Sequence, residues 1–300
     1  MDMAFFDREM RERDLINGRR DFRQPTSCDI LSPYHPNSHL SIGESHSMRK
    51  SVLAIAAHPD DIEFVMAGTM LRLAEKGWDL HYFNIANGAY GSMTQGPVEC
   101  AATRLAEAQN SAAMMGATFY APLCDDMNIF YTPDLLAKVV SVVRQAAPTI
   151  VLTHAPVDYM EDHQNACRLA VSAAFVRGMP NMPCNPPHSP YPGSVTIYHA
   201  QPHGNRTPLG ELVTPTHVVD ISKYMDKKSA LLRCHVSQES WLDSTQKMSS
   251  YVQTMWDLGR EVGKISGQYE FAEGWRRHIH LGFCEENADP LAAELLHASN

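Results

Sequence analysis

Short apolar runs alternate with amphipathic stretches of helical spacing from residue 51 onwards. Strands that alternate with helices are typical of βαβ units, in which parallel strands form one sheet with helices on its faces. The fold class that this pattern predicts is α/β, with a Rossmann-like, mostly parallel sheet flanked by helices and a smaller mixed C-terminal part. The predicted strands cover 52–57, 78–86, 117–121 and 149–153, and the predicted helices cover 62–76, 98–115, 133–147 and 164–176.

A proline-dense segment, "GMPNMPCNPPHSPYPG", follows the fourth βα unit. Because proline lacks a backbone donor and interrupts both helices and central strands, this segment is predicted to be a loop or the seam to the C-terminal part. Beyond it, strands are predicted at 194–200 and 216–222, and mostly helix from 223 to 277.

The polar residues 1–50 have the composition of a loop, so we expect an N-terminal extension that wraps the domain or contacts a neighbouring subunit. Such a contact would make the protein a homo-oligomer. Residues 51–300 are predicted to form a single domain, with a core at 51–178 and a C-terminal part at 194–283. A chain of this length can bury a substantial core.

The charge and hydropathy of the chain disfavour two classes of partner. Its 25 Lys and Arg against 34 Asp and Glu give a net charge of -9, whereas binding to nucleic acid needs clustered cations. No run approaches the roughly 18 apolar residues of a membrane-spanning helix. The seven cysteines never form a Cys-x-x-Cys pair. Neither a disulfide framework nor a zinc ribbon is therefore indicated, and we expect a cytoplasmic protein with reduced cysteines.

Polar residues end the first predicted strand abruptly. The apolar run 52–57 is followed at once by His58, Pro59, Asp60 and Asp61. Desolvating charge at the end of a core strand costs free energy unless the charge is paired or coordinates a metal. Because ligands of parallel α/β sheets bind beyond the carboxyl ends of the strands, these side chains are predicted to form a binding site.

A metal ion accounts for these residue types. His163, in "DYMEDH", follows the fourth strand, and right-handed crossovers place it on the same rim of the sheet as His58 and Asp61. Two histidines and one carboxylate leave an open position for water, as in catalytic zinc sites. Zn²⁺ is therefore the predicted cofactor, although other divalent ions suit the same donors. Asp60 remains as a general base for a water whose pKa the metal lowers to about 7.

Two alternatives need no metal. Asp60 or Asp61 could cap the helix that follows, with His58 in a simple turn. The chain could also be a non-catalytic, nucleotide-binding Rossmann-like module. That module needs a Gly-x-Gly-x-x-Gly turn after the first strand, whereas the turn here is His-Pro-Asp-Asp, which would repel phosphate.

The motif "AHPDD" after the first strand, with a "DH" that opens a later helix, resembles the LmbE/PIG-L family of metal-dependent N-deacetylases. Further pieces of the chain are similar to the family, so that the resemblance covers about residues 51 to 283. They are "NGAYG", "RLAEAQNSAAMMGA", "VVDISKYMDKKSALLRCHVSQ" and "YEFAEGWRR".

The resemblance implies hydrolysis of an N-acetyl group on an aminosugar or glycoconjugate, such as an N-acetylglucosamine derivative, with release of acetate and a free amine. It assigns His58, Asp61 and His163 to the metal and Asp60 to the general base. It also implies a substrate-facing role for Arg104 and contact with sugar hydroxyls for Asp126.

Each of the weaker assignments has a structural alternative. Arg104 and Glu107, spaced i, i+3, could form a surface pair. Asp126 could cap a loop while its neighbour Asp125 acts on the substrate, and Asp162 could orient the site or cap its helix. For His154 and His199, an ordinary core or loop histidine is the favoured interpretation.

The chain departs from the family at Met160. Well-known members carry "HPDH", whose first histidine stabilises the oxyanion or protonates the leaving amine, whereas this chain has "MEDH". A thioether cannot donate a proton. The expected substitute is His280, or else its neighbour His278, in "RRHIHLG". The loop "NGAYG" also has Ala89 where relatives often have an acid.

The predicted activity is therefore that of a zinc-dependent N-deacetylase, a hydrolase that acts on a linear amide bond of a small acetylated sugar or glycoconjugate. Two alternatives stay open. One is a metallohydrolase of the same fold that acts on another amide or an ester, and the other is a degenerate relative that only binds a ligand.

Overall fold

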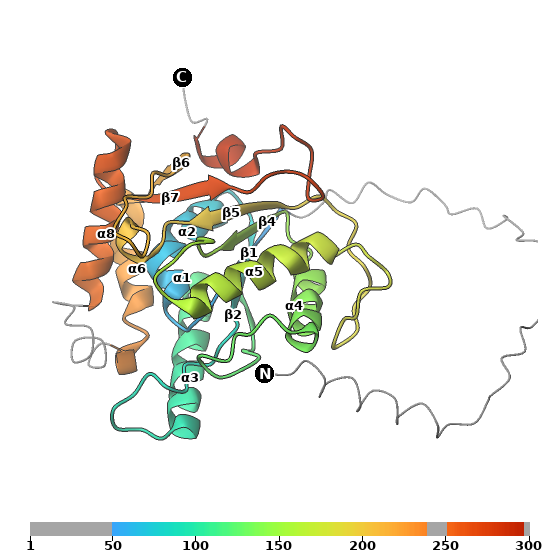
Figure 1. Ribbon diagram of the computed structural model, residues 1–300. Helices are drawn as coiled ribbons and strands as arrows, with labels where there is room; N and C mark the ends of the chain where they lie inside the picture. The colour runs from blue at the N-terminus through green and yellow to red at the C-terminus, as the bar shows by residue number, and fades with distance from the viewer. Residues whose placement is uncertain (1–49, 239–250, 297–300) are drawn as a thin grey trace, which may run out of the picture. The chain divides into compact units, whose positions relative to one another are not determined.

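The computed structural model describes residues 50–238 and 251–296, so the predicted N-terminal extension lies outside the described residues. The described chain forms one seven-stranded sheet with helices on both faces (Figure 1). Its strands are β1 (Ser51–Ala56), β2 (Asp79–Asn84), β3 (Thr118–Tyr120), β4 (Ile150–Thr153), β5 (Thr196–Ala200), β6 (His217–Asp220) and β7 (Ala272–Arg277). Its longer helices are α1 (Asp61–Val65), α2 (Ala67–Glu75), α3 (Pro97–Met115), α4 (Pro133–Ala146), α5 (Glu161–Val176), α6 (Met225–Leu232) and α8 (Tyr251–Ser266). Short helical segments are η1 (His203–Asn205), η2 (Ser222–Tyr224) and η3 (Ala292–Leu296).

The sheet has the strand order β3-β2-β1-β4-β5-β7-β6. The first five strands run parallel, whereas β7 is antiparallel to both β5 and β6. The predicted fold class, an α/β sheet that is mostly parallel with a mixed C-terminal part, is confirmed.

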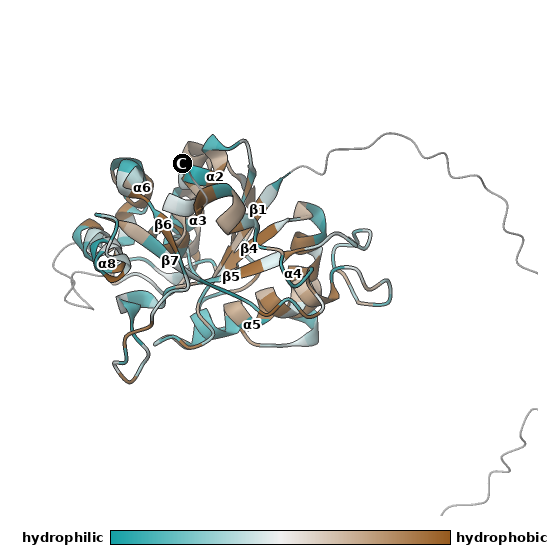
Figure 2. Cartoon of the chain, turned by 90° about the horizontal axis from the view of Figure 1, so that it is seen from above, coloured by the Kyte–Doolittle hydropathy of each residue, from teal (hydrophilic) through white to brown (hydrophobic). Residues whose placement is uncertain are grey.

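Strand β1 is buried on both faces, which explains its unbroken apolar sequence. Val52, Ala54 and Ala56 face one core with α2, α3, α6 and α8. Leu53 and Ile55 face a second core with α4 and α5. Figure 2 shows apolar residues gathered along the central strands between these helices. The loops that follow the central strands therefore stand on a rigid support.

The prediction of mostly helix from 223 to 277 is wrong for its last part. Residues 225–232 and 251–266 are helical, but 272–277 form β7 between β5 and β6. The sequence "AEGWRR" contains no β-branched residue, and its Ala, Glu and Gly are depleted in strands, so local propensity gave only a weak strand signal at Trp275. Pairing with two distant strands decides its conformation.

The helix predicted at 62–76 is divided at Met66, whose φ of -131° is not helical. The break exposes the first backbone amides of α2. Gly68 N–H and Thr69 N–H donate to the buried carboxylate of Glu273 at 2.8 and 2.7 Å. Since a helix N-terminus stabilises negative charge, the break supplies a partner for a buried glutamate of β7. In the part of the chain that the structure describes, no helix has the length and apolar character needed to cross a membrane.

Candidate metal centre

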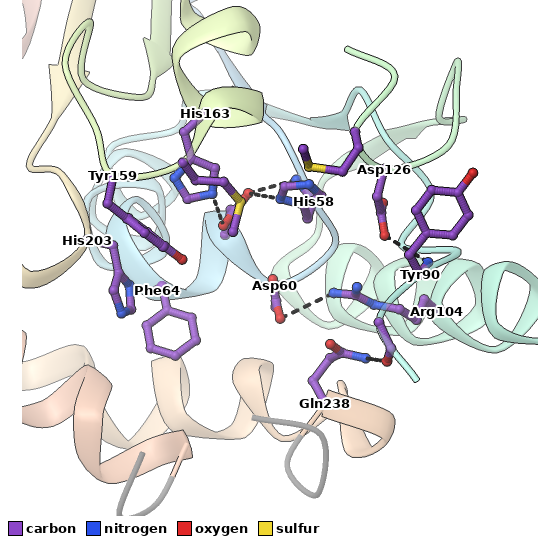
Figure 3. A pocket seen from close by; sticks show the side chains of 14 residues that line it. His58, Asp60, Phe64, Tyr90, Arg104, Asp126, Tyr159, His163, His203 and Gln238 are labelled. Carbon is purple, nitrogen blue, oxygen red and sulfur yellow. Dashed lines mark hydrogen bonds and ion pairs between the residues drawn. The ribbon is translucent and has the colours of Figure 1, made fainter. Parts of the chain in front are cut away.

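The site lies at the carboxyl ends of β1 and β4, which are parallel neighbours in the sheet. His58, Asp60 and Asp61 follow β1 directly, and His163 lies in the first turn of α5, after β4. All four line a cleft of about 270 Å³ that is open to solvent (Figure 3). His58, Asp61 and His163 offer ligand atoms that all lie within 4.8 Å of one another.

In both His58 and His163, one ring nitrogen lies within hydrogen-bond distance of a carboxylate other than Asp61. Nε2 of His58 lies 2.9 Å from Oδ2 of Asp162, and Nδ1 of His163 lies 3.0 Å from Oδ1 of Asp158. The other ring nitrogens face Asp61, at 3.5 Å from His58 and 3.2 Å from His163. Metal-bound histidines have this arrangement, because the outer carboxylate fixes the tautomer and aims the free nitrogen at the ion.

The pKa values of these groups indicate that the site favours positive charge. Although burial opposes it, contacts with Asp162 and Asp61 raise the pKa of His58 to about 9. Burial likewise opposes the charge of His163, but Asp61 and Asp158 raise its pKa to about 10. Burial also acts against ionisation of Asp61, yet the neighbouring histidines hold its pKa well below its usual value. A divalent ion would supply the charge that protons supply here, so the donor set fits a metal.

His154 lies beside the proposed ligands, with its Nε2 3.3 Å from Oδ2 of Asp61. Its ring stacks on that of His163, with centroids 4.1 Å apart, and its Nε2 accepts the backbone N–H of Ala57 at 3.0 Å. The nearby His199 is buried and lies 2.9 Å from the carbonyl of His154. His199 is thus a buried histidine with partners, which was the favoured interpretation. His154 differs, because with Asp158 and His163 it forms a second group whose ligand atoms lie within 4.8 Å of one another.

Asp60 occupies a strained position beside His58, Asp61 and His163. Its φ of 108° is rare for a residue with a side chain, and such strain is typical of functional sites. Its carboxylate does not cap α1, contrary to the simple alternative. Instead, Oδ2 accepts the hydroxyl of Tyr251 at 2.6 Å and lies 3.3 Å from the guanidinium of Arg104. Burial raises the pKa of Asp60, and the charge of Arg104 opposes that shift.

Arg104 is buried, which excludes a surface pair with Glu107. Its guanidinium donates to the carbonyl of Pro59 and pairs with Asp60. The two glycines of "NGAYG" make room for it. A Cβ at Gly88 would lie 2.4 Å from Cδ of Arg104, and a Cβ at Gly91 would lie 2.7 Å from its Nη1.

Glu107, on α3, binds the segment "HVSQ". Its carboxylate accepts the backbone N–H and the hydroxyl of Ser237, at 2.8 and 2.7 Å. The adjacent Gln238 donates to the carbonyl of Gly91 at 3.1 Å and lines the cleft. The segment "HVSQ" is therefore fastened to the glycine loop and to α3.

Asp126 lines the cleft and also holds the glycine loop. Its two carboxylate oxygens accept the N–H groups of Gly88 and Tyr90 at 2.7 and 3.0 Å. Asp125 is exposed and pairs with Asn87 at 2.6 Å. The loop-cap alternative therefore describes what Asp126 does in the fold, and its contact with a sugar remains a prediction.

The structure does not bring His280 to the site. His280 is not among the residues that line the cleft, and the ring of His278 bonds to that of His199 at 2.9 Å. The geometry therefore does not support the substitute predicted for the missing histidine. The segment after β7 turns toward β5 instead, because the backbone N–H of His278 donates to Ile197 of that strand.

Sequence reasoning missed several residues of the cleft, among them Phe64, His203 and Tyr159. His203 begins η1 just after β5, so the rule about carboxyl ends of parallel strands could have found it. Its ring contacts those of Phe64 and Tyr159, with centroids 5.5 and 5.7 Å apart. Tyr251 carries no such signal, since it reaches Asp60 from a helix 191 residues away.

Comparison with known proteins gives a consistent result. Residues 53–175 match the family profile of PIG-L, described as GlcNAc-PI de-N-acetylase. Diacetylchitobiose deacetylase of Thermococcus kodakarensis is 32% identical over 246 residues, which cover 79% of this chain and 86% of that protein. A 4-oxalmesaconate hydratase of Pseudomonas putida is 28% identical over 224 residues, which cover 71% of this chain and 81% of that protein.

Among solved structures, the N,N'-diacetylchitobiose deacetylase of Pyrococcus horikoshii shares the fold. It superimposes with a TM-score of 0.65 at 23% sequence identity, over 78% of this chain and 86% of that one. The sheet and the arrangement of its helices are thus those of an existing deacetylase structure.

Proposed function

Since this chain belongs to the LmbE/PIG-L family, we propose that it is a metal-dependent hydrolase that removes the N-acetyl group from an aminosugar or a glycoconjugate. One observation carries the proposal: two histidines, each backed by a carboxylate, direct their free nitrogens at Asp61, and the strained carboxylate of Asp60 lies beside them. This is the donor set of a hydrolytic metal site with an adjacent base.

We assign His58, Asp61 and His163 to a divalent ion, with Zn²⁺ as the first choice because of its preference for nitrogen and oxygen donors with an open position. An ion bound there would polarise the amide carbonyl and lower the pKa of a water to about 7. Asp158 and Asp162 keep the two imidazoles in the required tautomers.

Asp60 is proposed to take the proton of the attacking water. Tyr251 and Arg104 both engage its Oδ2, so that the carboxylate is held in one orientation and Oδ1 remains available. The oxygen of the water bonds to the carbonyl carbon, the carbon–nitrogen bond breaks, and the proton passes to the departing amine. The products are acetate and a free amino group.

Arg104 and Asp126 are proposed to contact the sugar. Both line the cleft on the side of Asp60, and the loop that Asp126 holds contributes Tyr90 and Gly91 to the same wall (Figure 3). The single domain at 51–300, the cytoplasmic location and the homo-oligomer remain proposals from the sequence.

A second candidate activity is hydration of a carbon–carbon double bond, since a 4-oxalmesaconate hydratase is among the relatives and this chain lacks the histidine at Met160. The two activities separate in one experiment. The purified protein, with its metal content measured by plasma mass spectrometry, is incubated with N-acetylglucosamine, diacetylchitobiose or a dicarboxylic enoate. We expect about one metal per chain and acetate release from an acetylated sugar. Loss of enoate absorbance without acetate release would contradict the deacetylase assignment.

A further inference from the structure

The cleft has no histidine at the position of Met160, yet the proposed reaction places negative charge on the carbonyl oxygen of the substrate. Preorganised hydrogen-bond donors at that oxygen are a large source of catalysis in acyl transfer. A thioether offers no such donor. A metal ion would polarise this oxygen, and the donor that the missing histidine would supply has to come from another group of the cleft.

The donors that line the described cleft fall on two sides. Arg104 and Gln238 lie on the side of Asp60, where Arg104 binds Pro59 and Asp60 and Gln238 binds Gly91 (Figure 3). These groups are already engaged. Tyr159 and His203 lie on the side of His163, near Met160.

Tyr159 is held in place by two neighbouring rings. Its ring centroid lies 5.7 Å from that of His163 at an interplanar angle of 87°, and 5.7 Å from that of His203 at 46°. Figure 3 shows its hydroxyl end turned toward the middle of the cleft. Within residues 50–238 and 251–296 this hydroxyl makes no hydrogen bond, and Tyr159 is about half exposed in the cleft, so the hydroxyl can donate to a bound ligand.

The other candidates on this side are less well placed. His203 packs behind Tyr159, with its ring against Phe64 at 5.5 Å. Tyr90 also lines the cleft, but its hydroxyl points away from His163 (Figure 3). Among the described residues that line the cleft, only Tyr159 combines a ring packed against His163 with a hydroxyl that is directed into the cleft and makes no hydrogen bond.

From this geometry we infer that Tyr159 is a catalytic residue whose hydroxyl donates a hydrogen bond to the carbonyl oxygen as it becomes an oxyanion. The phenol keeps its proton throughout and takes the place that the histidine of the "HPDH" motif has in relatives. This inference rests on the proposed function. His203 acts through Tyr159, by fixing the ring from behind.

The test compares Tyr159→Phe with Tyr131→Phe. Tyr131 is similarly exposed, at 41% against 48%, but does not line the cleft, so the two variants remove the same group inside and outside the proposed site. The readout that needs no turnover is the affinity for a methylphosphonamidate analogue of N-acetylglucosamine, whose tetrahedral oxygens mimic the oxyanion. Titration calorimetry measures that affinity, and glucosamine serves as a ligand without an oxyanion.

We expect Tyr159→Phe to bind the analogue about 100-fold more weakly and to bind glucosamine as the wild type does. Its kcat should fall by a similar factor with little change in KM and with the metal content retained. Tyr131→Phe should change the affinity for the analogue by less than about threefold. Equal affinity of the wild type and Tyr159→Phe for the analogue, or an equal loss in Tyr131→Phe, overturns the inference.

The failure of the inference is distinguishable from that of the proposed function. If the wild-type protein releases acetate and binds the analogue, and the Tyr159→Phe variant does both equally well, only the role of Tyr159 is excluded. If the metal-loaded wild-type protein neither releases acetate nor binds the analogue, both the proposed function and the role of Tyr159 are excluded.

Discussion

The hydroxyl of Tyr251 donates a 2.6 Å hydrogen bond to Oδ2 of Asp60, which precedes it by 191 residues. Both side chains are buried, and Asp60 takes up a left-handed backbone conformation that its sequence does not favour. The bond links the first loop of the domain to the first residue of α8. The orientation of the proposed base thus depends on a helix from the C-terminal part.

Asp60→Asn should keep the metal and lose turnover, because a base is removed and no ligand is. We expect kcat to fall by about 100- to 10,000-fold. Acetate release and plasma mass spectrometry measure the two properties on one preparation. His280→Ala is the control, since His280 does not line the cleft, and it should stay within about twofold of the wild type. A variant Asp60→Asn with wild-type kcat would exclude the proposed base.

Tyr251→Phe should lower kcat by about tenfold, because the carboxylate loses a charge-assisted hydrogen bond that holds its orientation. In the background of Asp60→Asn the same change should have almost no further effect. A double-mutant cycle on kcat measures this coupling. Additive losses would show that Tyr251 acts independently of Asp60.

His163→Ala should abolish stoichiometric metal binding, whereas Asp158→Asn should weaken it by about 10- to 100-fold, because Asp158 only orients His163. Competition with a chromophoric chelator measures both affinities. Asp125→Asn removes an exposed carboxylate outside this set and serves as the matched control. Full metal content in His163→Ala would mean that another residue completes the ligand set.

Gly88→Ala should destabilise the protein and raise KM. The alanine would meet a positive φ of 79° and a Cβ position 2.4 Å from Cδ of Arg104. Gly77→Ala separates the two effects, because Gly77 has a φ of 78° but no atom within 4 Å of its Cβ position. We expect the free energy of unfolding to fall by about 1 kcal/mol at Gly77, from the backbone alone, and by more at Gly88. Urea denaturation measures the stability of each variant, and steady-state kinetics measure its KM. Equal losses at the two positions would show that the contact with Arg104 is unimportant.

The metal-free protein should lose thermal stability as the pH rises from about 6.5 to 10. The folded-state pKa values of His58 and His163, about 9 and about 10, lie above the usual 6.5. Their stabilising contribution is therefore complete below pH 6.5 and is lost as the pH passes through the folded-state values. Calorimetry on chelator-treated protein should show a Tm decrease of several degrees, which the metal-loaded protein lacks. A flat Tm profile without metal would contradict the ion pairing with Asp61.

The sequence determined the parallel part of the sheet and the first half of the site. A fully apolar β1 and the following helices fix a parallel α/β core, because burial on both faces requires that pattern. The same pattern puts His58 and Asp61 at the carboxyl end of β1 and His163 at that of β4. These are local signals combined with one rule of topology.

Only the tertiary structure decided the surroundings of that site. The burial of Arg104, the bond of Tyr251 to Asp60 and the position of Tyr159 between two rings all join segments that are distant in sequence. For the same reason, β7 escaped prediction and His280 was assigned to a cleft that it does not reach. Local propensity and spacing carry no information about such contacts, because packing between elements selects them.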